Sequence, residues 1–388
     1  MAQDYRVLHS FAGPPNDGAK PEGGLVLDAN GNLYGTTNSG GAFTNSGDCT
    51  VFGCGTVFQL DPAGNLTVLH SFSGRSDDGK GPVGSLIRDS AGNLYGTTQF
   101  GSSYPCQPAA CGTVFRLDAQ GRLTTLHSFA GPPNDGAYPV GSLLRDSAGN
   151  LYGTTQEGGI IKRYSCNTGC GVVFKLDPTG NLTILHKFDG LDGAVPQGSL
   201  IGDAAGNLYG TTNAGGAAGL GTVFKLDPSG TLTVLHSFTR APTNGEFPLG
   251  VIGDASGSLY GTTNSGGAGG VGTLFKIDAA GNYSVVHSFL NGPKDGAYPQ
   301  AGLLQDAAGN LYGTTFAGGN RGRGTVFKLD PAGNFTVIHN FQGPPNDGWN
   351  PAARLIGDPA GNRIYGTTFA GGSSPVNGGG GVIFQIAP

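Results

Sequence analysis

The stretch Asn32-Leu33-Tyr34-Gly35-Thr36-Thr37 decides the fold, because its Tyr-Gly-Thr-Thr core occurs seven times in the 388 residues. The seven copies begin at Tyr34, Tyr95, Tyr152, Tyr209, Tyr260, Tyr312 and Tyr365. Successive copies lie 51 to 61 residues apart, so one supersecondary unit of that size is repeated in tandem. A repeat that runs from end to end predicts one closed array rather than two or three separate domains.

The composition narrows the class of protein. Glycine accounts for 74 residues, but the glycines stand at fixed places between apolar runs, which is typical of turns rather than of a flexible linker. The net charge is -5 and the chain has no Lys/Arg cluster, so we expect no nucleic-acid partner. No apolar run approaches the roughly 20 residues that span a bilayer, so we expect no membrane insertion.

The six cysteines form three local pairs, each after a Tyr-Gly-Thr-Thr copy and before a strand of the Val-Phe type. Zinc binding is the competing reading, but two thiols per loop without a nearby His fall short of four ligands. We therefore predict disulfides and an oxidising, extracytoplasmic location, secreted or at the cell surface, with residues 1–4 as a mature N-terminus after an added Met. The predicted pairs are Cys49/Cys54, Cys106/Cys111 and Cys166/Cys170.

Each repeat contains four expected strands. In the unit 82–129 these cover 84–89, 94–98, 112–118 and 123–129, with tight turns at 90–93 and 119–121. A four-stranded meander cannot bury both of its faces alone, whereas a ring of such sheets buries them against neighbouring sheets. The pattern therefore predicts a β-propeller.

The strand count predicts how the ring closes. A strand containing His and a strand of the Val-Phe type each occur seven times, and the chain starts inside a His strand and ends on a Val-Phe strand. We predict an all-β, seven-bladed propeller of four-stranded antiparallel blades, in which the N-terminal strand completes the last blade and removes an exposed edge. The predicted blades are 21–72, 82–129, 139–188, 196–238, 248–289, 299–341, and 351–386 plus 5–11.

Residues 82–95 read Pro-Val-Gly-Ser-Leu-Ile-Arg-Asp-Ser-Ala-Gly-Asn-Leu-Tyr, and a similar order returns in the other copies. This order resembles the NHL family of propellers, in which the first strand lines the central channel. More closely, the whole unit resembles the GloVer (Gloeo/Verruco) tandem repeat of bacterial exported or surface-anchored proteins. The resemblance implies a propeller fold and a secreted or surface location, and it carries no defined activity.

The polar residues of the repeat point to structural roles. The seven histidines occupy equivalent places in the outermost strand, so they cannot converge on one site. A series of Asp-Gly corners is typical of turns, with calcium binding as the alternative at Asp17, Asp135, Asp295 and Asp347. No Ser-His-Asp or Cys-His set stands out, so we predict no catalytic residue and no cofactor other than this candidate calcium.

Departures from the repeat indicate where a ligand could bind. The residues just before each repeat's proline vary, and four of them are aromatic: Tyr138, Phe247, Tyr298 and Trp349. On the long-loop face they could offer platforms for sugar rings or a patch for a protein, or they could simply cover blade edges.

Three functions are compatible with this pattern. The main expectation is a non-catalytic protein whose binding partner is a glycan, another protein or a second copy of the same chain. A self-assembling extracellular structural protein is the alternative. A calcium-dependent lactonase or lyase has the least support.

Overall fold

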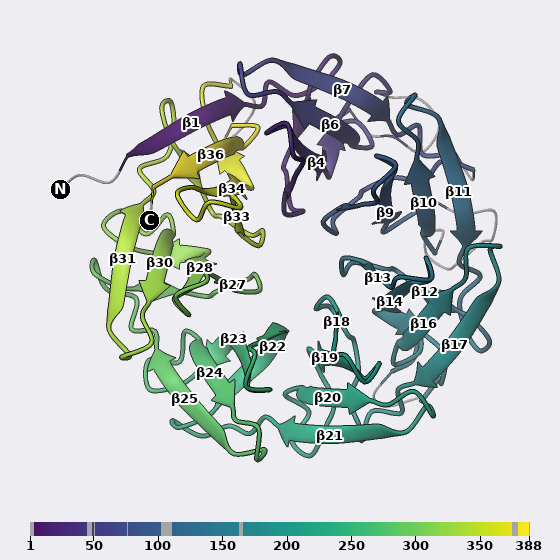
Figure 1. Ribbon diagram of the computed structural model, residues 1–388, viewed down its shortest axis with the longest axis vertical. Helices are drawn as coiled ribbons and strands as arrows, with labels where there is room; N and C mark the ends of the chain where they lie inside the picture. Colours follow the sequence, from purple (N-terminus) through teal and green to yellow (C-terminus); the bar gives the residue numbers. More distant parts are fainter. Residues whose placement is uncertain are drawn as a thin grey trace.

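A computed structural model describes residues 4–44, 49, 51–75, 77–101, 111–162, 166–374 and 379–387. These residues form an all-β structure, and none of them belongs to a helix that could cross a membrane. Seven four-stranded antiparallel sheets stand around a central channel like the blades of a propeller (Figure 1). The predicted fold class is confirmed.

In blades 1 to 6 the strands lie in chain order from the channel outward. Blade 1 contains β3 (Val26–Leu27), β4 (Leu33–Thr37), β6 (Thr56–Leu60) and β7 (Leu66–Ser71), and blade 2 contains β8 (Ile87–Arg88), β9 (Leu94–Thr98), β10 (Thr113–Leu117) and β11 (Leu123–Ser128). Blade 3 contains β13 (Leu144–Arg145), β14 (Leu151–Thr155), β16 (Val172–Leu176) and β17 (Leu182–Lys187). Blade 4 contains β18 (Ile201–Gly202), β19 (Leu208–Thr212), β20 (Thr222–Leu226) and β21 (Leu232–Ser237). Blade 5 contains β22 (Gly245–Gly253), β23 (Leu259–Gly266), β24 (Thr273–Ile277) and β25 (Tyr283–Ser288). Blade 6 contains β27 (Leu304–Gln305), β28 (Leu311–Thr315), β30 (Thr325–Leu329) and β31 (Phe335–Asn340). Four further two-stranded antiparallel sheets pair β2 (Gly18–Ala19) with β5 (Ser39–Gly40), β12 (Gly136–Ala137) with β15 (Glu157–Gly158), β26 (Gly296–Ala297) with β29 (Ala317–Gly318), and β32 (Gly348–Trp349) with β35 (Ala370–Gly371).

The two ends of the chain meet in blade 7. Its strands are β33 (Ile356–Gly357), β34 (Ile364–Thr368), β36 (Val382–Ile386) and, outermost, β1 (Tyr5–Ser10). β1 runs antiparallel to β36, from Tyr5 opposite Ile386 to Ser10 opposite Val382, and the two termini lie close together in Figure 1. The predicted closure by the N-terminal strand is therefore confirmed.

The Tyr-Gly-Thr-Thr motif forms the second strand of every blade, and its glycine makes room for a phenylalanine. Gly35 lies opposite Phe58, and a Cβ atom at Gly35 would stand 2.6 Å from the Cζ atom of that ring. Thr37 binds within the blade, with its Oγ1 atom 2.8 Å from that of Thr56. Thr36 instead faces the next blade, where its Oγ1 atom lies 3.4 Å from the carbonyl oxygen of Gly84. The equivalent bond to the next blade is made by Thr154, Thr262 and Thr367, whereas the Oγ1 atoms of Thr97, Thr211 and Thr314 have no hydrogen-bond partner among the described residues.

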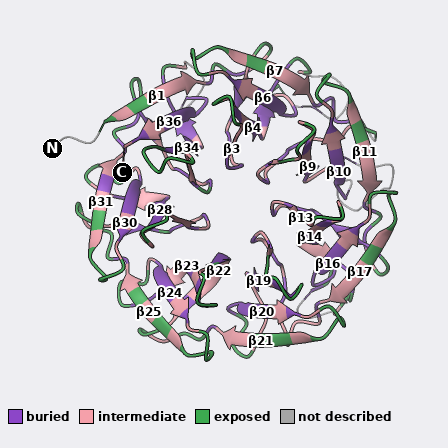
Figure 2. Cartoon of the chain, viewed as in Figure 1, coloured by how far each residue is buried: buried purple, intermediate pink, exposed green. Residues whose placement is uncertain are grey.

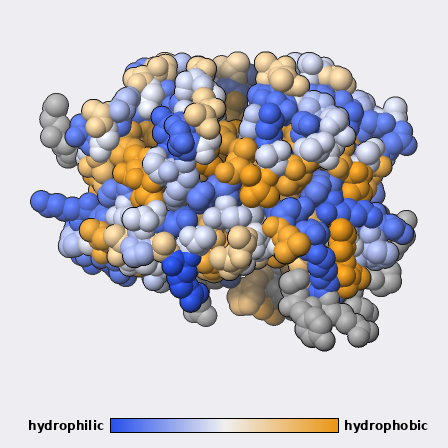
Figure 3. Space-filling model, turned by 90° about the horizontal axis from the view of Figure 1, so that it is seen from below, coloured by the Kyte–Doolittle hydropathy of each residue, from blue (hydrophilic) through white to orange (hydrophobic). Residues whose placement is uncertain are grey.

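The core lies between neighbouring blades. Phe72 of blade 1 and Phe115 of blade 2 are fully buried and meet edge to face, with ring centroids 5.4 Å apart. Such an aromatic contact adds about 0.5–1.5 kcal/mol beyond burial of the rings. Figure 2 shows this buried layer inside the ring of partly exposed outermost strands. In the edge-on view of Figure 3, hydrophobic residues alternate with hydrophilic ones across the rim.

The first strand is shorter than predicted in most blades. In blade 2 it covers only Ile87–Arg88, whereas the pattern predicted 84–89. The preceding backbone turns to the next blade instead, where the amide of Ser85 donates to the Oγ atom of Ser142 at 3.0 Å. Blade 5 is the exception, because β22 is nine residues long and contains a register shift between Pro248 and Val251.

Two of the three predicted disulfides are present. Cys49 is bonded to Cys54, and Cys166 to Cys170. Cys106, the predicted partner of Cys111, lies outside the described residues. The two disulfides are consistent with an extracytoplasmic protein.

Candidate functional site

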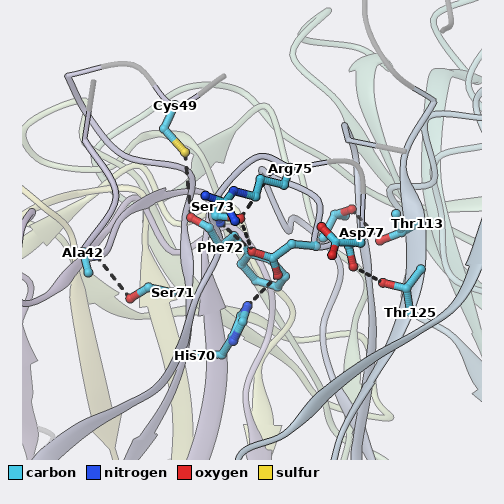
Figure 4. Close-up of polar contacts among 12 residues, drawn as sticks. Ala42, Cys49, His70, Ser71, Phe72, Ser73, Arg75, Asp77, Thr113 and Thr125 are labelled. Atoms are coloured by element: carbon cyan, nitrogen blue, oxygen red, sulfur yellow. Dashed lines mark hydrogen bonds and ion pairs between the residues drawn. The ribbon is translucent and has the colours of Figure 1, made fainter. Parts of the chain in front are cut away.

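The histidines and the Asp-Gly corners meet at the outer rim, blade by blade. His70 of β7 points toward the corner that follows its own blade, where its Nε2 atom lies 2.7 Å from the carboxylate of Asp78 (Figure 4). Five other blades contain the same pair: His9–Asp17, His127–Asp135, His186–Asp192, His287–Asp295 and His339–Asp347. In blade 4 the partner is instead Asn244, whose Oδ1 atom lies 3.2 Å from the Nε2 atom of His236.

The rim carboxylates also accept backbone hydrogen bonds. Asp135 accepts the amide of Ala130 at 2.9 Å and that of Gly136 at 2.7 Å, besides its contact with His127. The candidate calcium ligands Asp17, Asp135, Asp295 and Asp347 are all engaged by nitrogen donors in this way, on four separate corners. Within the described part of the chain, no group of three or more His, Cys, Asp or Glu residues could hold a metal ion.

In blade 4 the histidine faces a neutral amide, because Asn244 stands where the other corners have Asp. Burial lowers the pKa of His236, and the neutral amide of Asn244 offsets this only in part. At the corner of blade 1, burial raises the pKa of Asp78, but the hydrogen bonds from His70 and Ser73 outweigh it and hold the pKa below its usual value. The rim is therefore a set of satisfied structural pairs.

The four candidate aromatic residues do not form one platform. Tyr138, Phe247 and Tyr298 directly precede a proline and have φ near +58°, a left-handed conformation that costs about 1–2 kcal/mol in a residue with a side chain. Trp349 stands one residue earlier, in β32, and its ring lies 5.2 Å from the guanidinium of Arg323. Asn350 takes the left-handed position in its blade.

The left-handed residue joins two blades through its backbone. The amide of Tyr138 donates to the carbonyl of Cys111 at 2.8 Å, and its own carbonyl accepts the amide of Gln156 at 3.1 Å. The side chain of Tyr138 is only 8% exposed, whereas that of Tyr298 is 39% exposed. Of the four candidates, only Phe247 lines the pocket described next. The proposal that these aromatics bind a ligand stays a prediction.

A pocket of about 580 Å³ opens at the mouth of the channel, on the face of the long loops. Every blade contributes the residue that follows its proline, and four blades also contribute the residue that follows Tyr-Gly-Thr-Thr. Six of the lining side chains are carboxamides: Gln99, Gln156, Gln197, Asn213, Asn264 and Gln300. Each offers two N–H donors and one acceptor oxygen, so the wall suits a ligand rich in hydroxyl groups.

Glu22 is the one ionisable side chain among the residues described as lining this mouth. It follows Pro21 in blade 1 and is half-buried. Burial raises the pKa of its carboxyl, and the nearby positive charge of Lys20 opposes this without cancelling it. A carboxylate with a raised pKa is a better proton acceptor than one in water, and such perturbed groups in concave sites are candidates for acid–base chemistry.

Glu22 was not among the site residues predicted from the sequence. A sharper signal was present. In the other blades the residue after the proline is uncharged: Val83, Val140, Gln197, Leu249, Gln300 and Ala352. A single charge at a position where six blades have none indicates a site formed once per ring.

The model of the Gloeobacter/Verrucomicrobia repeat family matches residues 1–200, 111–307 and 283–388, which together span the chain. No curated protein has a matching sequence.

Several solved structures are similar to the chain. One is a Bacteroides uniformis protein named as a candidate 6-phosphogluconolactonase, with 14% identity, a TM-score of 0.51, and coverage of 86% of this chain and 88% of the other. A gluconolactonase of Xanthomonas campestris has 14% identity and a TM-score of 0.48, over 100% of this chain and 90% of its own. Luciferin-regenerating enzyme has 11% identity and a TM-score of 0.47, over 100% and 95%. At identities this low, the likeness shows the fold.

One of these structures corrects the functional expectation. The sequence pattern favoured a non-catalytic binder of a glycan or protein, with a self-assembling structural protein as the alternative, whereas the Bacteroides uniformis protein with the same fold is named as a candidate lactonase. The expectation was drawn from the repeated residues and not from the mouth residues, which vary from blade to blade. The repeated motif, the ring of seven blades and the match along the whole chain lead to one conclusion about identity: the chain belongs to the Gloeobacter/Verrucomicrobia repeat family.

Proposed function

We propose that the protein is a hydrolase that opens small cyclic esters of polyhydroxylated acids in the mouth pocket, with Glu22 as the general base. The observation that carries this proposal is the setting of Glu22, a lone carboxyl with a raised pKa among carboxamides. The fold shared with the candidate 6-phosphogluconolactonase of Bacteroides uniformis is compatible with lactone chemistry.

The proposed reaction needs one group that moves a proton. The Glu22 carboxylate takes a proton from a water molecule while the water oxygen bonds to the lactone carbonyl carbon. The tetrahedral oxyanion then collapses, the ring C–O bond breaks, and protonated Glu22 returns the proton to the departing ring oxygen. The sum is one lactone and one water converted to one hydroxy acid, and Glu22 ends in its starting form.

The carboxamides supply recognition. Amide N–H groups from Gln99, Gln156 and Asn213 on successive blades can donate to ring hydroxyls or to the developing oxyanion, while their oxygens accept from hydroxyls. A volume of about 580 Å³ lies within the range of small-molecule sites, about 300–1,000 Å³. The wall also includes Val83, Val140 and Leu249, which can contact the carbon skeleton.

The test compares hydrolysis of a polyhydroxylated lactone, glucono-δ-lactone, with that of unsubstituted δ-valerolactone, measured as acid release in a pH-stat above the spontaneous rate. We expect preference for the hydroxylated substrate. The Glu22→Gln variant keeps the shape but cannot accept a proton, so we expect kcat to fall by about 10²–10⁴-fold. As pH falls through the raised pKa of Glu22, activity should fall as well, because the base becomes protonated.

Glu157 provides a matched control. Burial raises the pKa of this carboxyl too, but its side chain does not line the mouth pocket. Glu157→Gln should therefore leave kcat unchanged. Wild-type protein that hydrolyses neither lactone, or a Glu22→Gln variant as active as the wild type, would refute the proposed function.

The same proposal includes a location outside the cytoplasm. The Cys49–Cys54 and Cys166–Cys170 disulfides support it, because cytosolic thiols are normally kept reduced. Fractionation of producing cells, with mass-spectrometric detection of both disulfides, tests the location. Protein found in the cytosol with free thiols at all four positions would contradict it.

A further inference from the structure

The fourth residue of the proline-led motif lines the central channel below the mouth. It is Ser in blades 2 to 4 and Gly in blades 1 and 6: Ser85, Ser142, Ser199, Gly24 and Gly302. Blade 7 has Arg354 at this place. These residues border a lumen of about 620 Å³, so the substitution introduces one guanidinium into a layer of small side chains.

The three serines leave a donor for a further partner. The Oγ atom of Ser85 accepts the amide of Gly24 at 2.8 Å. In the same way, Ser142 accepts from Ser85 at 3.0 Å and Ser199 accepts from Ser142 at 3.1 Å. Each oxygen is thus used as an acceptor, while its proton can still be donated to a group in the lumen.

Arg354 borders the lumen, where its side chain is exposed to solvent. The protein atoms of the channel wall lower the pKa of its guanidinium. Its Nε atom donates to the carbonyl of Leu303 at 2.9 Å. Within the described residues, no carboxylate lies within ion-pair distance of Arg354. A guanidinium that lines a lumen without a counter-charge favours binding of an anion.

Blade 5 provides additional space opposite Arg354. Its motif is one residue shorter, since Val251 directly follows Gly250 where the other blades have a further residue. A recess of about 380 Å³ lies between blades 4 and 5 and is bordered by Arg354. Asp203 and Asp254 also border it, but their carboxylates accept hydrogen bonds within their own turns, from Asn207 and Ser258 among others.

We propose that the channel lumen holds a small oxyanion, phosphate or carboxylate, bound by the Arg354 guanidinium, with the serine hydroxyls of the same layer as further donors. Planar guanidinium groups match both anions with two parallel hydrogen bonds. Arg354 follows the mouth residue Ala352 by two positions, so the lumen site adjoins the mouth pocket. The anion is therefore either free or the charged end of a molecule whose other end reaches the mouth.

Isothermal titration calorimetry of the full chain tests this site with three probes: inorganic phosphate, sulfate and glucose 6-phosphate. We expect saturable binding by the wild type. Arg354→Ser restores the residue found in blades 2 to 4, so the variant should fold, and we expect its affinity to fall roughly 10- to 100-fold. Arg363→Ser removes an exposed arginine from the same blade and should bind like the wild type.

The probes separate the two sources of the anion. Equal binding of phosphate and glucose 6-phosphate identifies a site for the free ion, whereas binding of glucose 6-phosphate alone identifies a subsite that extends the mouth pocket. Both results support the site if Arg354→Ser weakens them. Unchanged binding by the Arg354→Ser variant, or no binding of any probe to the wild type, would overturn it. Because calorimetry needs no turnover, the Glu22→Gln variant should still bind, and the result is independent of the proposed hydrolase activity.

Discussion

The outer rim and the channel mouth both contain carboxyl groups, but in opposite settings. Six rim carboxylates repeat with the blades, and each is held by its own histidine and by backbone amides. The mouth has the single carboxyl of Glu22, whose pKa is raised by burial. The recurring rim carboxylates are thus satisfied within the framework, whereas the Glu22 carboxyl leaves hydrogen-bonding capacity for a ligand.

The largest expected effect comes from replacing one carboxyl at the mouth and one at the rim by the corresponding amide. Glu22→Gln should lower kcat by about 10²–10⁴-fold and leave the unfolding midpoint in place. Asp135→Asn should do the reverse and lower stability by about 1 kcal/mol while kcat is retained, because the histidine of blade 4 is already paired with Asn at its corner. Lactone hydrolysis and urea unfolding measure the two effects. Loss of activity in Asp135→Asn would remove the distinction between the rim and the mouth.

The next largest effect concerns the repeated framework. A Cβ atom at Gly153 would lie 2.6 Å from the Cζ atom of Phe174, so Gly153→Ala should cost about 1–3 kcal/mol of unfolding free energy. Gly253→Ala is the control, because its Cβ atom would meet Ile201 at 3.5 Å, an ordinary contact. Urea denaturation compares the two variants. Equal stability would mean that the glycine of the motif is not required by packing.

A smaller effect is expected from Asn244→Asp, which gives His236 the same carboxylate partner as the other rim histidines. The lowered pKa of His236 means that the unfolded chain binds a proton more readily, so this residue's contribution to stability is present above pH about 6.5 and is lost as pH falls. Asn244→Asp supplies a carboxylate that favours the imidazolium. We expect the pKa of His236 to rise by about one unit, which corresponds to about 1.4 kcal/mol.

Imidazole titration by NMR measures that pKa, and unfolding at about pH 5.5 and about pH 8 measures the change in stability. The variant should gain more at the lower pH. His127, already paired with Asp135, is the internal control in the same spectra. An unchanged His236 pKa would show that the rim pairs do not act through charge.

The smallest expected effect is at the left-handed joints between blades. Tyr298 has φ of 56° and a partly exposed side chain, and blade 2 has Gly81 at the corresponding place. Tyr298→Gly should relieve backbone strain and change stability by no more than about 1 kcal/mol, because the entropy of glycine in the unfolded chain offsets the gain. Thermal unfolding of the variant and the wild type measures this change in stability. A loss much larger than this would show that the tyrosine ring itself joins the blades.

Much of the framework was predictable from sequence because it depends on local chemistry repeated seven times. Strand-forming runs and glycine turns indicate a four-stranded unit, and seven His strands with seven Val-Phe strands indicate closure by residues 5–11. The register before the proline was harder. Trp349 was grouped with Tyr298, but Asn350 is the equivalent residue, because it directly precedes the proline and has the left-handed backbone conformation.

The sequence by itself determined the number of blades, their internal order and the two observed disulfides, because contacts between neighbouring segments produce all of these. It also determined the ring closure, because the equal counts of His strands and Val-Phe strands leave one strand at each end of the chain to pair with the other. Only the tertiary structure decided which residues face the channel together. Glu22, Gln156 and Gln300 come from blades far apart in the chain, and the register of each blade against the axis brings them to one pocket. Burial in the assembled ring then raises the pKa of the Glu22 carboxyl.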